Sequence, residues 1–124
     1  AAPLGTPGSL TLLGGGAYVD LGATATHTAN GQFDGFTVEA WVYFDQIGNY
    51  ARIVELFQTA GTDNIVLCRE GTTSNLYFGL RKAGVVKSMT AQGVIRNGQW
   101  MHFAATIDAQ GVGRIYIDGK TKPE

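Results

Sequence analysis

The chain is short of cysteine, proline and charge, and these shortages exclude several classes of protein. It has one cysteine, Cys68, so an internal disulfide is excluded. Only 15% of its 124 residues are charged, the net charge is −1, and the nine basic residues are scattered with no run longer than two, so no nucleic-acid partner is expected. No apolar run approaches the roughly 18 residues of a membrane span, so membrane insertion is not expected either. With 44% hydrophobic residues the chain is too apolar for a disordered one.

Three segments show a strict two-residue alternation, which is the period of a β-strand with two different faces. They are Phe36–Phe44, Gln99–Asp108 and Arg114–Asp118. In each segment one face is aliphatic, and the other is aromatic and polar. The predicted core face consists of Phe36, Val38, Ala40, Val42, Phe44, Met101, Phe103, Ala105, Ile107, Ile115 and Ile117.

Shorter apolar segments between glycine-rich turns predict further strands. They are Ser9–Leu13, Ala17–Leu21, Arg52–Gln58, Asn64–Arg69, Asn75–Lys82 and Val85–Ala91, and Gly22–Gly35 is expected to be a long loop. Alternation places Arg52, Val54 and Leu56 on one side of their strand, and Cys68 is expected to be a small buried side chain. About nine short strands predict one all-β domain over residues 1–124, an antiparallel two-sheet sandwich or jelly roll.

The segments YVDLG, FTVEAWVYF, QWMHFAATID and GRIYIDGK together resemble the laminin-G-like jelly roll of the concanavalin A-like lectin and glucanase superfamily. The resemblance runs from about Leu10 to Lys120. It implies two curved antiparallel sheets and a secreted, extracellular or cell-surface location. It also implies a module that binds a glycan or another cell-surface ligand.

The sequence departs from that family before the YVDL segment, where acidic residues can help to bind calcium. Here no carboxylate occurs from Leu12 to Val19, and a hard cation needs several oxygen ligands. Asp20 and Asp34 are the weak metal candidates, and calcium stays open as a cofactor. Such acids more often cap turns than bind metal, as we also expect for Asp63 and Asp108.

A second departure concerns the family's strands after the DGK turn, which are expected beyond Lys120. The resemblance therefore predicts a domain that lacks its last strands in this sequence, with open sheet edges. Three origins for the missing strands stay open: a longer or cleaved protein, a partner chain, or a compact variant that needs none.

The aromatic and polar face predicts a ligand site, because aromatic rings stack on sugars and neighbouring polar groups fix hydroxyls. The pattern places four candidate ligand-binding residues near Glu39: Trp41, Trp100, His102 and Tyr116. The other candidates, Tyr43, Tyr77 and Arg81, lie nearer the ends of their strands. The competing interpretation is that Trp41, Trp100 and His102 pack beneath a covering segment, with His102 satisfied by a hydrogen bond.

Catalysis is not expected. Glycoside hydrolysis needs two carboxyl groups roughly 5–9.5 Å apart, and neither the strand of Glu39 nor that of Glu55 offers a second acid. His27 and His102 lack the spacing of a zinc site. The sequence therefore predicts a non-catalytic carbohydrate-binding or adhesion module. The alternative is a structural assembly subunit completed by strands of a partner chain or a cleaved C-terminal fragment, and a glucanase-like glycoside hydrolase comes third.

Overall fold

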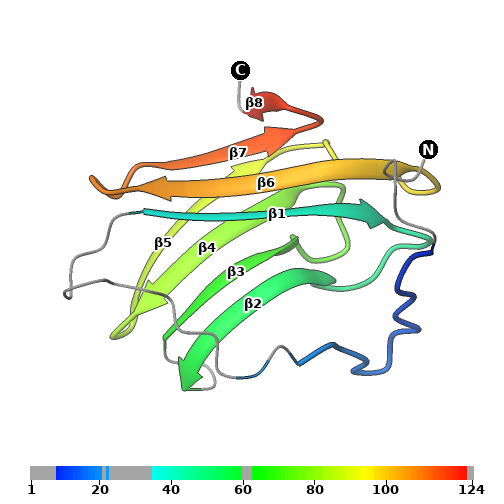
Figure 1. The fold of residues 1–124 in the computed structure, drawn as a ribbon, viewed down its shortest axis with the longest axis horizontal. Helices are drawn as coiled ribbons and strands as arrows, with labels where there is room; N and C mark the ends of the chain where they lie inside the picture. Colours follow the sequence, from blue (N-terminus) through cyan, green and yellow to red (C-terminus); the bar gives the residue numbers. More distant parts are fainter. Residues whose placement is uncertain (1–7, 21, 23–34, 60–62, 123–124) are drawn as a thin grey trace.

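The computed structural model describes residues 8–20, 22, 35–59 and 63–122, which form two antiparallel sheets packed as a sandwich (Figure 1). Sheet A has the order β1-β6-β7-β8, with β1 Gly35–Tyr43, β6 Trp100–Asp108, β7 Gly113–Ile117 and β8 Lys120–Lys122. Sheet B has the order β2-β3-β4-β5, with β2 Arg52–Thr59, β3 Asp63–Arg69, β4 Leu76–Lys82 and β5 Val85–Ala91. The predicted all-β sandwich is confirmed.

The core lies between the sheets and is built from the aliphatic face that the alternation predicts. In sheet A, Met101, Phe103 and Ile115 are fully buried, and Leu76 and Phe78 of β4 face them from sheet B. Each such side chain contributes roughly 1.5–3 kcal/mol when fully buried. The inward residues of β1 are only half-buried, because β1 is an edge strand with a neighbour on one side alone.

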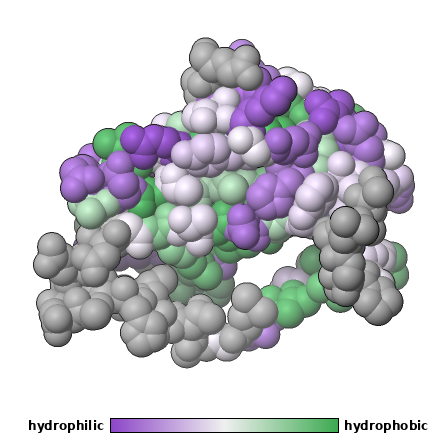
Figure 2. Space-filling model, turned by 45° about the horizontal axis from the view of Figure 1, so that its top comes forward, coloured by the Kyte–Doolittle hydropathy of each residue, from purple (hydrophilic) through white to green (hydrophobic). Residues whose placement is uncertain are grey.

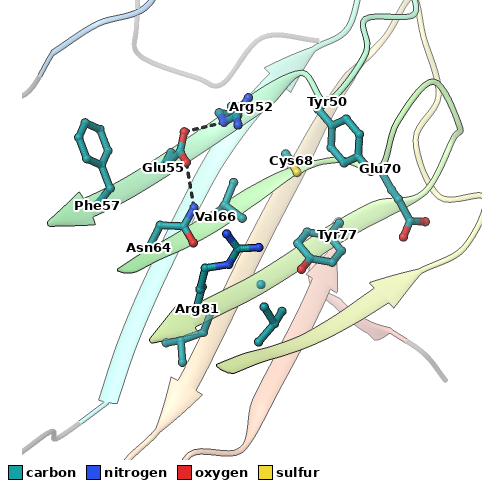
Figure 3. Close-up of a pocket in the computed structure, with 13 residues that line it drawn as sticks. Tyr50, Arg52, Glu55, Phe57, Asn64, Val66, Cys68, Glu70, Tyr77 and Arg81 are labelled. Carbon is teal, nitrogen blue, oxygen red and sulfur yellow. Dashed lines mark hydrogen bonds and ion pairs between the residues drawn. The ribbon is translucent and has the colours of Figure 1, made fainter. Parts of the chain in front are cut away.

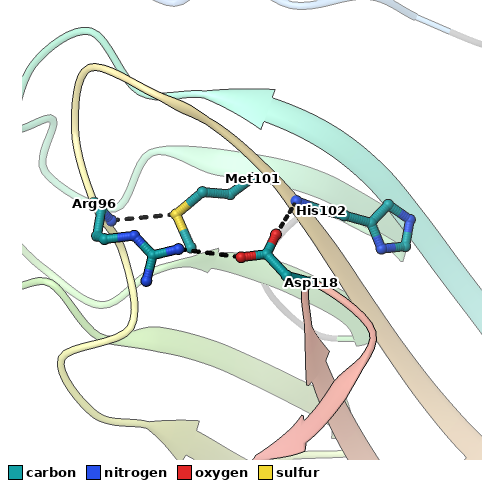
Figure 4. Close-up of polar contacts among 4 residues, drawn as sticks. All are labelled: Arg96, Met101, His102 and Asp118. Carbon is teal, nitrogen blue, oxygen red and sulfur yellow. Dashed lines mark hydrogen bonds and ion pairs between the residues drawn. The ribbon is translucent and has the colours of Figure 1, made fainter. Parts of the chain in front are cut away.

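The turn between β7 and β8 is tied to β6 through Asp118 (Figure 4). Asp118 and Gly119 both have left-handed backbone (φ 49° and 79°), as in the tight turns for which Asp-Gly is favoured. The Asp118 carboxylate accepts hydrogen bonds from the backbone N–H of His102 (2.9 Å) and from Arg96 (3.1 Å). The Asp118 N–H donates in turn to the His102 carbonyl (2.8 Å). The Asp-Gly of the IYIDGK segment therefore has a structural role.

A buried arginine connects the loops at one end of the sandwich. Arg69 is fully buried, and its guanidinium donates to the Thr73 carbonyl (2.9 Å) and to Asn97 Oδ1 (2.6 Å). The same group lies over the Phe44 ring, 4.8 Å from its centroid. Burial lowers the pKa of Arg69 from its ordinary value.

The first two predicted strands are wrong. Residues 8–20 contain no strand, and Leu21 lies outside the described residues. Leu13 and Tyr18 are 92% and 77% exposed, and Figure 2 shows apolar residues at the molecular surface among hydrophilic ones. The glycines at 14–16 all have left-handed backbone, which interrupts an extended chain, and no described strand pairs with this segment. Most of the predicted Gly22–Gly35 loop (residues 23–34) also lies outside the described residues, while Gly35 opens β1.

Two details of the other strands differ from the prediction. A β-bulge between Arg52 and Val54 shifts the register of β2, so that Arg52 lies on the outer face while Ile53 packs against the core. The predicted grouping of Arg52 with Val54 and Leu56 is therefore wrong for Arg52, because the bulge adds one residue to the strand. The short β8 was not predicted. Among the described residues no helix has the length and apolar character to cross a membrane.

Candidate functional site

A groove of about 560 Å³ runs over the outer face of sheet B (Figure 3). Strand register arranges its floor in rows that cross β2, β3 and β4. Glu55, Val66 and Gly79 form one row. The next row lies towards the C-terminal ends of β2 and β4 and consists of Phe57, Asn64 and Arg81. Cys68 and Tyr77 form the row on the other side, and Tyr50, Arg52 and Glu70 also line the groove.

An exposed aromatic surface in this groove comes from Tyr77 and depends on Gly79. A Cβ atom built on Gly79 would stand 2.5 Å from the Tyr77 hydroxyl and 2.7 Å from the ring carbon that carries it. The phenol ring thus occupies the space that a side chain at position 79 would fill. Gly79 is buried and Tyr77 is only half-buried, so the ring covers the glycine backbone while part of the tyrosine stays accessible from the groove.

Glu55 is held in place by two neighbours. Its carboxylate forms an ion pair with Arg52 and accepts a hydrogen bond from the Asn64 side-chain amide (3.0 Å). The β2 bulge makes the ion pair possible, because it brings Arg52 to the same face as Glu55, three residues along. A carboxylate and an amide fixed in this way are suited to orienting ligand hydroxyl groups.

The groove holds a second carboxylate, Glu70, near its other end. Asn75 donates to it (2.9 Å), and Thr90 Oγ1 lies 3.5 Å from it. Glu70 lies four residues beyond Val66, the partner of Glu55, which corresponds to about 13 Å along the strand at roughly 3.3 Å per residue.

Cys68 lies in the groove floor with 3% of its surface exposed, which confirms the predicted small buried side chain. Burial raises the pKa of its thiol to about 11, and the nearby Arg52 guanidinium only partly offsets this shift. The thiol therefore stays neutral and is a poor nucleophile near neutral pH.

Most of the other predicted ligand residues lie on the outer face of sheet A. Two ring pairs cross from β1 to β6: Trp41 with His102 (centroids 5.3 Å apart) and Tyr43 with Trp100 (5.8 Å apart). His102 Nε2 lies 3.5 Å from a carboxylate oxygen of Glu39. We call this surface the aromatic face; it comprises Glu39, Trp41, Tyr43, Trp100, His102, Ala104 and Tyr116.

The structure therefore divides the predicted ligand residues between the two outer surfaces of the sandwich. Tyr77 and Arg81 lie in the groove of sheet B, and the remaining five belong to the aromatic face of sheet A. These seven residues cannot form one site, because the core separates the two faces. Sequence reasoning did not identify Tyr50, Glu55 and Asn64 as groove residues, since only strand register brings them beside Tyr77.

The acidic residues discussed as metal candidates take part in turns. Asp20 accepts a hydrogen bond from the Gly22 N–H (2.8 Å), Asp63 from the Ala83 N–H (2.8 Å), and Asp108 from the Val112 N–H (2.9 Å). Asp34 lies outside the described residues. Within the described part of the chain, no group of three or more His, Cys, Asp or Glu side chains is placed to hold a metal ion.

A comparison with known protein families identifies the family of this chain. Residues 13–124 match a laminin G domain model described as the concanavalin A-like lectin/glucanases superfamily. The match covers nearly the whole chain, and the chain belongs to this family. Comparisons with curated proteins and with solved structures gave no match.

Proposed function

We propose that this member of the concanavalin A-like lectin and glucanase superfamily is a non-catalytic carbohydrate-binding module that holds a neutral glycan in the groove of sheet B. The superfamily contains both lectins and glucanases, so a sugar chain is the ligand class that its description favours. An extracellular or cell-surface location is part of the same proposal.

The observation that carries the proposal is the position of Tyr77 over Gly79. A ring that occupies the side-chain space of a glycine lies close to the sheet and presents an apolar surface beside polar groups. Ligand sites combine apolar contact surface with a few placed polar groups in this way. A pyranose ring stacked on Tyr77 would have Glu55 one row away and Asn64 two rows away.

The charges of the groove favour a neutral ligand. Arg52 and Arg81 are balanced by Glu55 and Glu70, so the lining residues carry no net charge. An acidic glycan would meet two carboxylates as well as two guanidinium groups. A neutral glycan can use all of these groups as hydrogen-bond partners for its hydroxyls.

The partners of the acids support binding without hydrolysis. The Glu55 and Glu70 carboxylates each accept a hydrogen bond from an asparagine side chain, Asn64 and Asn75. Glu39 lies on the opposite outer surface of the sandwich. A glucanase activity is therefore the weaker proposal.

The test is a glycan array with the wild-type chain and two tyrosine variants. Tyr77→Ala removes the stacking surface. The matched control is Tyr18→Ala, which removes a 77% exposed tyrosine that belongs neither to the groove lining nor to the aromatic face. We expect neutral glycans to be retained equally by wild type and by Tyr18→Ala, and their retention to fall strongly in Tyr77→Ala with an unchanged circular dichroism spectrum. Equal binding by all three proteins would refute the groove as the site.

A second candidate function is assembly with another chain through an added strand. β1 and β2 each lie at one edge of their sheet, and the inward side chains of β1 are only half-buried. An added strand would cover them and pair with an open edge. This candidate predicts a concentration-dependent mass in sedimentation experiments, whereas the carbohydrate-binding module alone predicts a monomer.

A further inference from the structure

We propose that the aromatic face of sheet A is a second carbohydrate-binding surface, independent of the groove, so that one chain can bridge two glycan strands. The core separates this face from the groove, and the two surfaces point in opposite directions. The chain would then be bivalent without forming a dimer.

The aromatic face offers ring surface that is accessible and fixed. Trp41 is 46% exposed and Tyr43 is 44% exposed, although each packs against a ring on β6 at a tilt of 57° or 59°. Trp41 and Tyr43 lie on adjacent rows of β1, so their Cα atoms are about 6.6 Å apart. Stacking on rings that are already held in place costs little side-chain entropy.

Polar groups lie beside these rings. Glu39, Ala104 and Tyr116 form one row across β1, β6 and β7, and Ala104 between the other two is buried. The Glu39 side chain is 66% exposed and lies 3.5 Å from His102 Nε2. The row thus has a hydrogen-bond acceptor, the Glu39 carboxylate, at one end and the Tyr116 phenol at the other.

The size of the exposed rings favours a sugar over a protein partner. Aromatic side chains cover 150–250 Å² each, so the exposed parts of Trp41 and Tyr43 offer roughly 200 Å² together. A stable protein interface buries about 800 Å² on each partner. A small ligand with apolar ring faces and many hydroxyls fits an area of this size and its mixed polarity.

Tryptophan fluorescence separates this site from the groove, because both tryptophans of the chain, Trp41 and Trp100, belong to the aromatic face. The probe is soluble mixed-linkage β-glucan, and the proteins are wild type, Tyr77→Ala and Trp41→Ala. We expect a saturable change of emission in wild type and in Tyr77→Ala. In Trp41→Ala we expect the change reported by Trp100 to fall at least fivefold.

An emission change that is absent in wild type, or that disappears in Tyr77→Ala, would overturn the second site. Failure of the groove proposal would look different, because calorimetric binding would then be unaffected by Tyr77→Ala. Trp41→Phe keeps an aromatic ring at this position, so the emission of Trp100 should still change when β-glucan is added. Beads coated with β-glucan should clump with wild type and stay dispersed with either alanine variant, while clumping that survives in both contradicts bridging.

Discussion

The phenol ring of Tyr77 lies in the space that a side chain on Gly79 would occupy, two residues further along β4. This arrangement relates a glycine in the interior of a strand to the shape of the groove. A glycine in the interior of a strand weakens that strand, and it often marks a β-bulge or a place where another group approaches the backbone closely. Here the close approach is made by a neighbouring aromatic ring, which connects the sequence of β4 to the proposed ligand surface.

Gly79→Ala is expected to weaken glycan binding with little change in stability. The new methyl group would displace the Tyr77 ring, which can swing away because it is a side chain, and Gly79 does not have left-handed backbone. We expect affinity to fall at least tenfold, or about 1.4 kcal/mol. Unfolding free energy should change by less than about 1 kcal/mol. Calorimetry and urea denaturation measure the two quantities, and unchanged affinity would count against the role of the ring.

Cys68 is expected to react slowly with thiol reagents in the folded chain. A pKa of about 11 against an ordinary 9.0 lowers the thiolate fraction at neutral pH about a hundredfold, and burial limits access further. Alkylation by iodoacetamide near neutral pH should therefore be at least a hundred times slower in the native chain than in urea. Equal rates would show that the groove floor is open to solvent.

Arg69→Met is expected to destabilise the fold strongly. The substitution removes the hydrogen bonds of the buried guanidinium to Thr73 and Asn97 and its contact with the Phe44 ring, which together cost about 2–4 kcal/mol. Arg52→Met is a matched control, because the Arg52 side chain is 56% exposed and an exposed ion pair contributes only about 0–1 kcal/mol. Urea denaturation compares them, and equal losses would contradict the structural role of Arg69.

Stability is expected to fall in acid partly through Asp108. Hydrogen bonds from the Val112 N–H and from Arg114 hold the pKa of this carboxyl below its ordinary value of 3.8, with a further contribution from the Gln110 N–H. A depressed pKa stabilises the folded chain above the unfolded pKa, and this contribution disappears as pH falls through the folded one.

The matched variant for this acid dependence is Asp108→Asn, which cannot titrate. Wild type should therefore lose more unfolding free energy than Asp108→Asn between about pH 5 and pH 2. Urea denaturation along this pH series measures the difference. Parallel pH curves for the two proteins would rule out a contribution from Asp108.

The strands of the core were predictable because their alternation is strict. Met101, Phe103 and Ile115 are buried where the pattern places them, since a two-residue period fixes the face of every side chain. The segment with Leu13 and Tyr18 shares this apolar character but has no strand beside it. Apolar pattern alone therefore does not show whether a pairing partner exists.

The candidate site was predictable only in part. Tyr77 and Arg81 were identified from their alternation on one strand, whereas Glu55 and Asn64 join them through the register of three strands. The bulge that brings Arg52 beside Glu55 has no glycine or proline to mark it. Nor does periodicity show that Trp41 and Tyr77 lie on opposite surfaces, because strands of different sheets can share the same pattern.

The most direct test of the proposed function is a nuclear magnetic resonance titration of the isotope-labelled chain with a neutral oligosaccharide selected on the glycan array. The account predicts saturable shifts of the backbone amides of Glu55, Asn64 and Tyr77, and the loss of these shifts in Tyr77→Ala. Shifts confined to sheet A, or shifts at these amides that persist in Tyr77→Ala, would contradict it.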